Sequence, residues 1–62
     1  MENRILRRPG VKDRTGLTDS QIDRLEKEGR FPSRFKITTR AVGWSMLEVD
    51  AWVKERLSGK AA

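Results

Sequence analysis

The most informative part of this sequence is a segment that contains several basic side chains and no acidic one. Residues 29–45 hold four bases and no Asp or Glu. These bases are Arg30, Arg34, Lys36 and Arg40. Guanidinium and ammonium groups bind phosphate oxygens, so the run predicts contact with a polyanion. The 62-residue chain carries 14 basic and 9 acidic side chains, a net charge of +5, which favours nucleic acid or an anionic membrane surface as partner.

The remaining charges are unevenly distributed along the chain. Residues 1–17 carry five bases and two acids, whereas residues 18–28 carry two bases and four acids. The last segment, residues 46–62, has three of each and therefore lacks the basic face of a membrane-surface helix. Positive charge is thus concentrated in two blocks that an acidic segment separates.

Several classes of function find no support in the residue types. The chain has no cysteine and no histidine, which excludes disulfides and zinc sites built from those residues. It has no Gly-rich phosphate loop and is too short to form a sizeable pocket, so we expect no enzyme activity, cofactor, metal or small-molecule substrate. No apolar run approaches the roughly 18–20 residues that span a bilayer, and the N-terminus lacks the apolar core of a secretory signal. We therefore expect a cytoplasmic protein without a membrane partner.

Two helices joined by a tight turn are predicted in the first half of the chain. After a short extended piece, Pro9 suits the first turn of a helix and Gly16 the residue that follows its end. The second helix has the signature of a capping box, in which Thr18 caps the N-terminus and Gln21 returns the hydrogen bond. Gly29 ends this helix. The three residues between the two helices are typical of a helix-turn-helix.

A change of period predicts a β-hairpin over residues 35–44. Apolar side chains alternate there with polar ones, and a loose loop between the strands would place Phe35 opposite Trp44 and Ile37 opposite Val42. The basic side chains would then lie on the other side of the hairpin and at its tip.

A final helix follows the hairpin. Ser45 and Glu48 form a second capping box, Gly59 suits its end, and residues 58–62 are expected to be a frayed tail. The apolar stripe at helical spacing consists of Val49, Trp52, Val53 and Leu57. Both Trp44 and Trp52 are therefore predicted to be core residues rather than exposed platforms for stacking bases.

The order of these elements predicts a single domain over residues 1–62. It is a small α+β winged helix-turn-helix, with about three helices, a β-hairpin wing and a short N-terminal extended segment. A helix fits the major groove of B-DNA and presents side chains to base edges, while a basic hairpin beside it can reach the backbone. On the polar face of the second helix, Gln21 and Arg24 are predicted to read bases with support from Ser20.

Residues 15–56 resemble the AlpA family of phage and prophage regulators. The most specific pieces are TGL before the second helix, EGRFP after it, and AVGW followed by EVDAW; RILRRPGV also matches the usual leader. The family is related to excisionases and shares its winged helix-turn-helix core with MerR-type proteins. The resemblance implies a bacterial or phage-derived protein that binds specific double-stranded DNA sites. Activation of integrase or excisionase genes, their repression, and direction of recombination all remain open.

The resemblance also implies which residues contact DNA. In the recognition helix these are Thr18, Ser20, Gln21, Arg24 and Lys27. In the wing they are Arg34, Lys36, Thr38, Thr39 and Arg40. Weaker N-terminal candidates are Arg7 and Arg8. One departure is that Asp19 and Asp23 stand where the family usually has Arg and Tyr, and acids near phosphates weaken binding.

A protein-interaction module is the alternative function. The acidic helix over residues 18–28 would then bind a basic partner such as an integrase or another regulator. Salt-sensitive binding to a specific duplex would argue against this as the main role.

Overall fold

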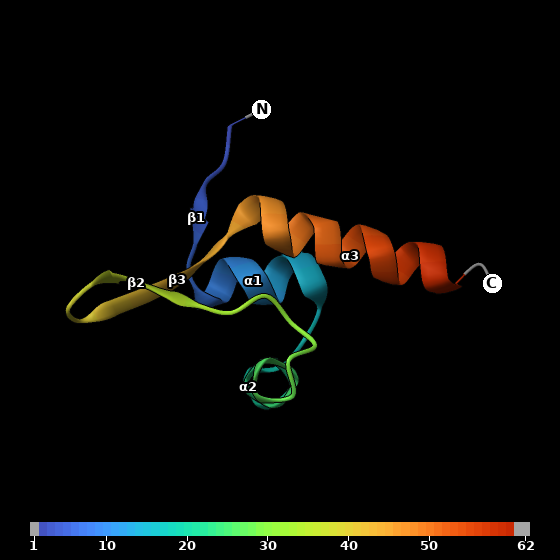
Figure 1. The fold of residues 1–62 in the computed structure, drawn as a ribbon, viewed down its shortest axis with the longest axis horizontal. Helices are drawn as coiled ribbons and strands as arrows, with labels where there is room; N and C mark the ends of the chain where they lie inside the picture. Colours follow the sequence, from blue (N-terminus) through green and yellow to red (C-terminus); the bar gives the residue numbers. More distant parts are fainter. Residues whose placement is uncertain (1, 61–62) are drawn as a thin grey trace.

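The computed structural model describes residues 2–60 and confirms the predicted α+β winged helix-turn-helix. In chain order, the described elements are β1 (Ile5–Leu6), α1 (Arg8–Thr15), α2 (Asp19–Lys27), β2 (Phe35–Thr38), β3 (Ala41–Ser45) and α3 (Met46–Lys60). The hairpin of β2 and β3 projects to one side of the molecule and α3 extends to the other, while α2 is seen end-on below α1 (Figure 1). Within residues 2–60, no helix has the length and apolar composition to cross a membrane.

The predicted start and stop signals of the first two helices are confirmed. Pro9 lies in the first turn of α1, and Gly16 follows that helix with a φ of 73°. At the start of α2, the Gln21 N–H donates to Thr18 Oγ1 at 3.2 Å and the Thr18 N–H donates to Gln21 Oε1 at 2.9 Å. Gly29 follows α2 with a φ of 74°, a conformation that glycine adopts at no steric cost.

The sheet has β3 at its centre, with β1 and β2 antiparallel on either side. Phe35 pairs with Gly43 rather than with Trp44, so the predicted register is wrong by one residue at this end of the hairpin. The predicted loose loop is also wrong, because only Thr39 and Arg40 separate the strands. Neither has the positive φ of a primed hairpin turn, and the pairing shifts register between Lys36 and Thr38, beside the turn.

The hydrophobic core joins all three helices to the sheet. Its buried members are Val11, Ile22, Phe31, Trp44 and Val49. Trp44 is fully buried, as predicted, but Trp52 is half-buried and packs against the edge of the core. The Trp52 ring meets Phe31 edge-to-face with centroids 5.0 Å apart, and its Nε1 donates to the Arg30 carbonyl oxygen at 2.7 Å.

The last helix departs from the sequence prediction at its C-terminal end. One of the two hydrogen bonds of the predicted capping box is present at its start, where Ser45 Oγ accepts the Glu48 N–H at 3.4 Å. The helix continues through Gly59 to its last residue, so the predicted end is wrong; residues 61–62 of the predicted tail lie outside the described residues. Leu57, the last member of the predicted stripe, is 64% exposed because this half of α3 extends beyond the other elements (Figure 1).

We predict that Gly43→Ala destabilises the fold, because β1, β3 and β2 approach closely at this residue. A Cβ there would lie 2.6 Å from Ile5 Cγ2, 2.8 Å from Ile37 Cδ1 and 3.0 Å from the Leu6 carbonyl oxygen. We expect a loss of about 1–3 kcal/mol in the free energy of unfolding, measured by urea denaturation. The control Gly59→Ala meets open space in the last turn of α3, where glycine costs less than in the middle of a helix, and should not lower this value. An unchanged value for Gly43→Ala would show that the strands separate without cost.

Candidate nucleic-acid interface

Helix α2 carries three stripes of side chains, because residues spaced by three and four share a helix face. The apolar stripe is Ile22 and Leu25, the acidic stripe is Asp19, Asp23 and Glu26, and the outer stripe is Ser20, Arg24 and Lys27. The apolar stripe packs into the core, and all three side chains of the outer stripe are exposed. The helix therefore separates its acids from the residues that were predicted to face DNA.

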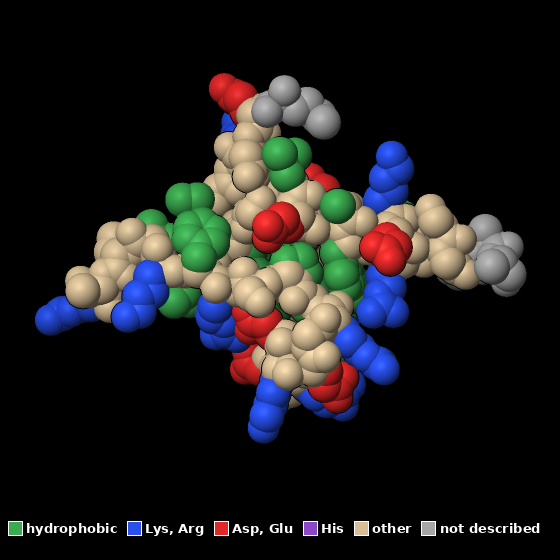
Figure 2. Space-filling model, in the orientation of Figure 1, with side chains coloured by type: hydrophobic (Ala, Val, Ile, Leu, Met, Phe, Trp, Pro, Cys, Tyr) green, Lys and Arg blue, Asp and Glu red, His purple; other side chains and the backbone are tan. Residues whose placement is uncertain are grey.

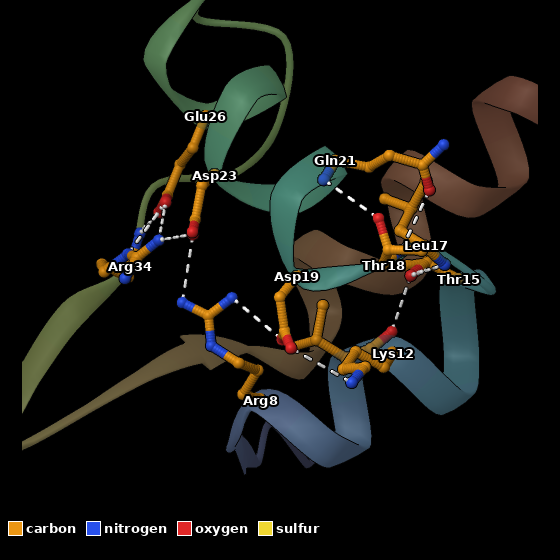
Figure 3. A network of polar contacts seen from close by, with 11 residues as sticks. Arg8, Lys12, Thr15, Leu17, Thr18, Asp19, Gln21, Asp23, Glu26 and Arg34 are labelled. Atoms are coloured by element: carbon orange, nitrogen blue, oxygen red, sulfur yellow. Dashed lines mark hydrogen bonds and ion pairs between the residues drawn. The ribbon is translucent and has the colours of Figure 1, made fainter.

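Each carboxylate of the acidic stripe meets a cation from another segment of the chain. Arg8, the first residue of α1, lies between Asp19 and Asp23, at 3.3 Å and 3.1 Å from their nearest oxygens (Figure 3). Lys12 also contacts Asp19, at 3.3 Å, and Arg34 contacts Asp23 at 2.7 Å. The charges of the two aspartates that depart from the family pattern are thus offset within the chain.

Glu26 is the most enclosed acid of the stripe, with only 12% of its side chain exposed. The Arg34 N–H donates to Glu26 Oε2 at 2.5 Å, and Arg34 Nε donates to Oε1 at 2.8 Å. Burial alone would raise the pKa of Glu26, but the bonds from Arg34 outweigh it and lower that pKa below its ordinary 4.5. The hydrogen bonds from Arg34 and then Arg8 likewise lower the pKa of Asp23, while Glu26 and then Asp23 raise the pKa of Arg34.

The indole of Trp44 underlies these ion pairs. The guanidinium carbon of Arg8 lies 5.5 Å from the centre of its ring, and that of Arg34 lies 5.1 Å away, which is the range of a cation–π contact. We call the group Arg8, Lys12, Asp19, Asp23, Glu26 and Arg34 the carboxylate–arginine cluster. Since Trp44 belongs to β3, the cluster connects α1, α2 and the hairpin.

The predicted recognition-helix residues fall into two groups. Thr18 and Gln21 close the capping box, on the side of α2 away from Asp23 (Figure 3). Ser20, Arg24 and Lys27 are exposed, and their side chains make no hydrogen bond or ion pair to another residue of the described chain.

The predicted wing residues are also divided. Lys36, Thr38, Thr39 and Arg40 are exposed along the hairpin and at its turn. Lys and Arg side chains project from this end of the molecule (Figure 2). Arg34 instead precedes β2 and belongs to the carboxylate–arginine cluster. Of the N-terminal pair, Arg7 is exposed at the start of α1, whereas Arg8 is in the cluster.

Sequence reasoning missed the cluster, including the contribution of Lys12. The spacing of the three acids along α2 was a usable signal, because it places them on one face. Their partners lie 7 to 15 residues away along the chain, and no local pattern connects them. Asn3 was missed as well: its Oδ1 accepts the Leu47 N–H at 3.0 Å in the first turn of α3.

The family model described as prophage CP4-57 regulatory protein (AlpA) matches residues 4–57. The chain belongs to the AlpA family. The match covers both helices of the helix-turn-helix, the hairpin and most of α3, so the AlpA assignment applies to the whole site. AlpA is a family of prophage regulatory proteins, in agreement with the resemblance found in the sequence.

A phage protein is also similar to this AlpA chain. The uncharacterized protein ORF88 of Enterobacteria phage P4 is 36% identical over 59 residues. The aligned region is 95% of this chain and 67% of the phage protein. This similarity agrees with the prophage assignment.

We predict that the carboxylate–arginine cluster makes stability depend on pH in the acid range. The pKa values of Asp23 and Glu26 lie below their ordinary 3.8 and 4.5, so their ionised forms stabilise the fold above those values. This contribution disappears as the pH falls through the lowered values. Urea midpoints should be flat from about pH 7 to 5 and fall towards about pH 3. Glu26→Gln should reduce that fall and Glu28→Gln should not; equal profiles would contradict the assignment.

Proposed function

We propose that this AlpA-family protein binds specific sites in double-stranded DNA through the outer stripe of α2 and the hairpin wing. The observation that carries the proposal is the segregation of charge on α2. The carboxylates of the acidic stripe are paired with cations of the same chain, although Asp19 and Asp23 are 55% exposed, while the side chains of Ser20, Arg24 and Lys27 are exposed without such partners in the described chain. A helix with such a face can enter a major groove without directing carboxylates at the phosphates.

The two parts of the interface have different chemical roles in this proposal. Lys36 and Arg40 on the wing bind phosphates, which supplies affinity without reading sequence. Arg24 has the geometry to bind guanine O6 and N7 together, with Ser20 and Lys27 in support. Gln21 would need its amide oxygen and nitrogen to bind adenine, but the oxygen is occupied in the capping box. Thr18 is occupied in the same way.

The regulatory consequence follows from the family. By binding its site, the protein would activate or repress integrase or excisionase genes, or direct excision, in a prophage or integrative element. The alternative use of α2, as an acidic surface for an integrase or another regulator, has less support because the acidic stripe already has cation partners in the chain.

One prediction concerns the wing. The double variant Lys36→Ala/Arg40→Ala should weaken binding to the preferred site, as selected from a pool of randomised duplexes, and to random duplex by the same factor. The slope of log affinity against log salt should become shallower by about one unit for each phosphate that the variant no longer neutralises. Fluorescence anisotropy over a salt series measures this slope. If the slope does not change, neither residue contacts the backbone.

Another prediction concerns the outer stripe and uses the same preferred site. Arg24→Ala should remove about 1–3 kcal/mol of preference at one base pair, measured by competition with single-base variants of that site. Gln21→Glu keeps a residue that can close the capping box and should retain both stability and base preference. If Gln21→Glu loses the preference and Arg24→Ala keeps it, base reading belongs to Gln21 instead.

A further inference from the structure

We propose that Arg34 is a positioning residue, which fixes the hairpin wing relative to α2 and does not itself contact phosphate. The proposal rests on the DNA-binding function above. It assigns a different task to a residue that the family resemblance placed among the DNA contacts of the wing.

The bonds of Arg34 hold both its backbone and its side chain against one carboxylate. Its N–H donates to Glu26 Oε2 at 2.5 Å, while Nε and one terminal nitrogen donate to Oε1 at 2.8 Å and 2.5 Å. Three bonds to one side chain define the path of the chain where it enters β2. Since Glu26 lies on α2, they tie the beginning of the wing to the proposed recognition helix.

A second carboxylate extends the same connection to α1. One oxygen of Asp23 accepts from Arg34 at 2.7 Å and from Arg8 at 3.1 Å. Both guanidinium groups also lie over the ring of Trp44, which is fully buried in β3. The shared carboxylate offsets the repulsion between the two cations, so α1, α2 and the hairpin meet at one ring.

A phosphate that took the place of these carboxylates as the partner of Arg34 would disrupt this arrangement. Arg34 Nε and the same terminal nitrogen already bond the carboxylates, and the arginine side chain is only 33% exposed. Moving it to DNA would leave Glu26, 12% exposed, without its cation, and an enclosed unpaired carboxylate is costly. Arg34 therefore contributes more by holding the wing at a fixed distance from the outer stripe, since a preorganised interface loses less entropy on binding.

A pair of charge-neutralising variants tests whether the loss of an acid from α2 raises or lowers the affinity for DNA. Glu26→Gln and Glu28→Gln each remove one negative charge near the C-terminal end of α2, but Glu28 forms no ion pair with another described residue. If only charge matters, both variants bind DNA more tightly, and by similar factors. We expect Glu28→Gln to bind slightly more tightly, whereas Glu26→Gln should lose about tenfold in affinity for the selected site, as strongly coupled groups do. Tighter site binding by Glu26→Gln would overturn the proposal.

Variants of Arg34 itself separate positioning from phosphate binding. Arg34→Lys keeps the charge, so a phosphate contact would survive, but an ammonium cannot reproduce the forked bonds to Glu26 and Asp23. We expect Arg34→Lys to lose site affinity with an unchanged salt slope on random duplex, in contrast to Arg40→Ala, whose slope should become shallower by about one unit. Parent-like site affinity for Arg34→Lys would overturn the proposal.

A measurement without DNA separates failure of this proposal from failure of the proposed function. In the free protein, Glu26→Gln should accelerate amide hydrogen exchange in β2 and β3 more than Glu28→Gln does, because the bonds of Glu26 to Arg34 are the larger part of the wing's attachment to α2. Equal exchange in the two variants would refute the positioning role, whatever the protein binds. If the parent chain binds no duplex in a salt-dependent manner, it is the proposed function that fails.

Discussion

The contact of two arginines with one buried indole is the interaction on which the rest of this structure depends. A chain of this length buries only about 60% of its unfolded surface, so a single large side chain has an unusual share of the packing. Trp44 packs with Val11, Ile22 and Val49 in the core, and Arg8 and Arg34 lie over its ring. One residue therefore belongs at once to the hydrophobic core and to the ion-pair cluster above it.

This arrangement makes a helix with excess acid compatible with the proposed binding of DNA. The segment 18–28 carries four acids and two bases, which as a uniform surface would repel phosphates. In the fold, the acidic stripe of α2 contacts cations of α1 and of the segment before β2. The basic side chains of the outer stripe lie on another face of the helix and are exposed. The acids of α2, which would repel phosphates on a uniform surface, thus help to orient the helix against α1 and the segment before β2.

The wing depends on close approach rather than on large side chains. Gly43 lets the outer strands lie close to β3, and the pairing of β2 with β3 shifts register next to the two-residue turn. The exposed Lys36 and Arg40 therefore stand on a short, tightly connected ribbon whose base is anchored by Arg34. Position and charge are supplied by different residues.

The sequence by itself determined the elements, the fold class and the family, because these depend on local signals. Pro9, Gly16 and the capping box of Thr18 and Gln21 act over a few residues, and the family motifs are contiguous. Only the tertiary structure decided which basic side chains are in ion pairs and which are not. In the sequence, Arg34 and Arg8 look like any other arginine, because the carboxylates beside them come from other segments of the chain. The hairpin register was likewise decided by packing at Gly43 and a shift in β2, since alternation of apolar residues does not specify which strand positions pair.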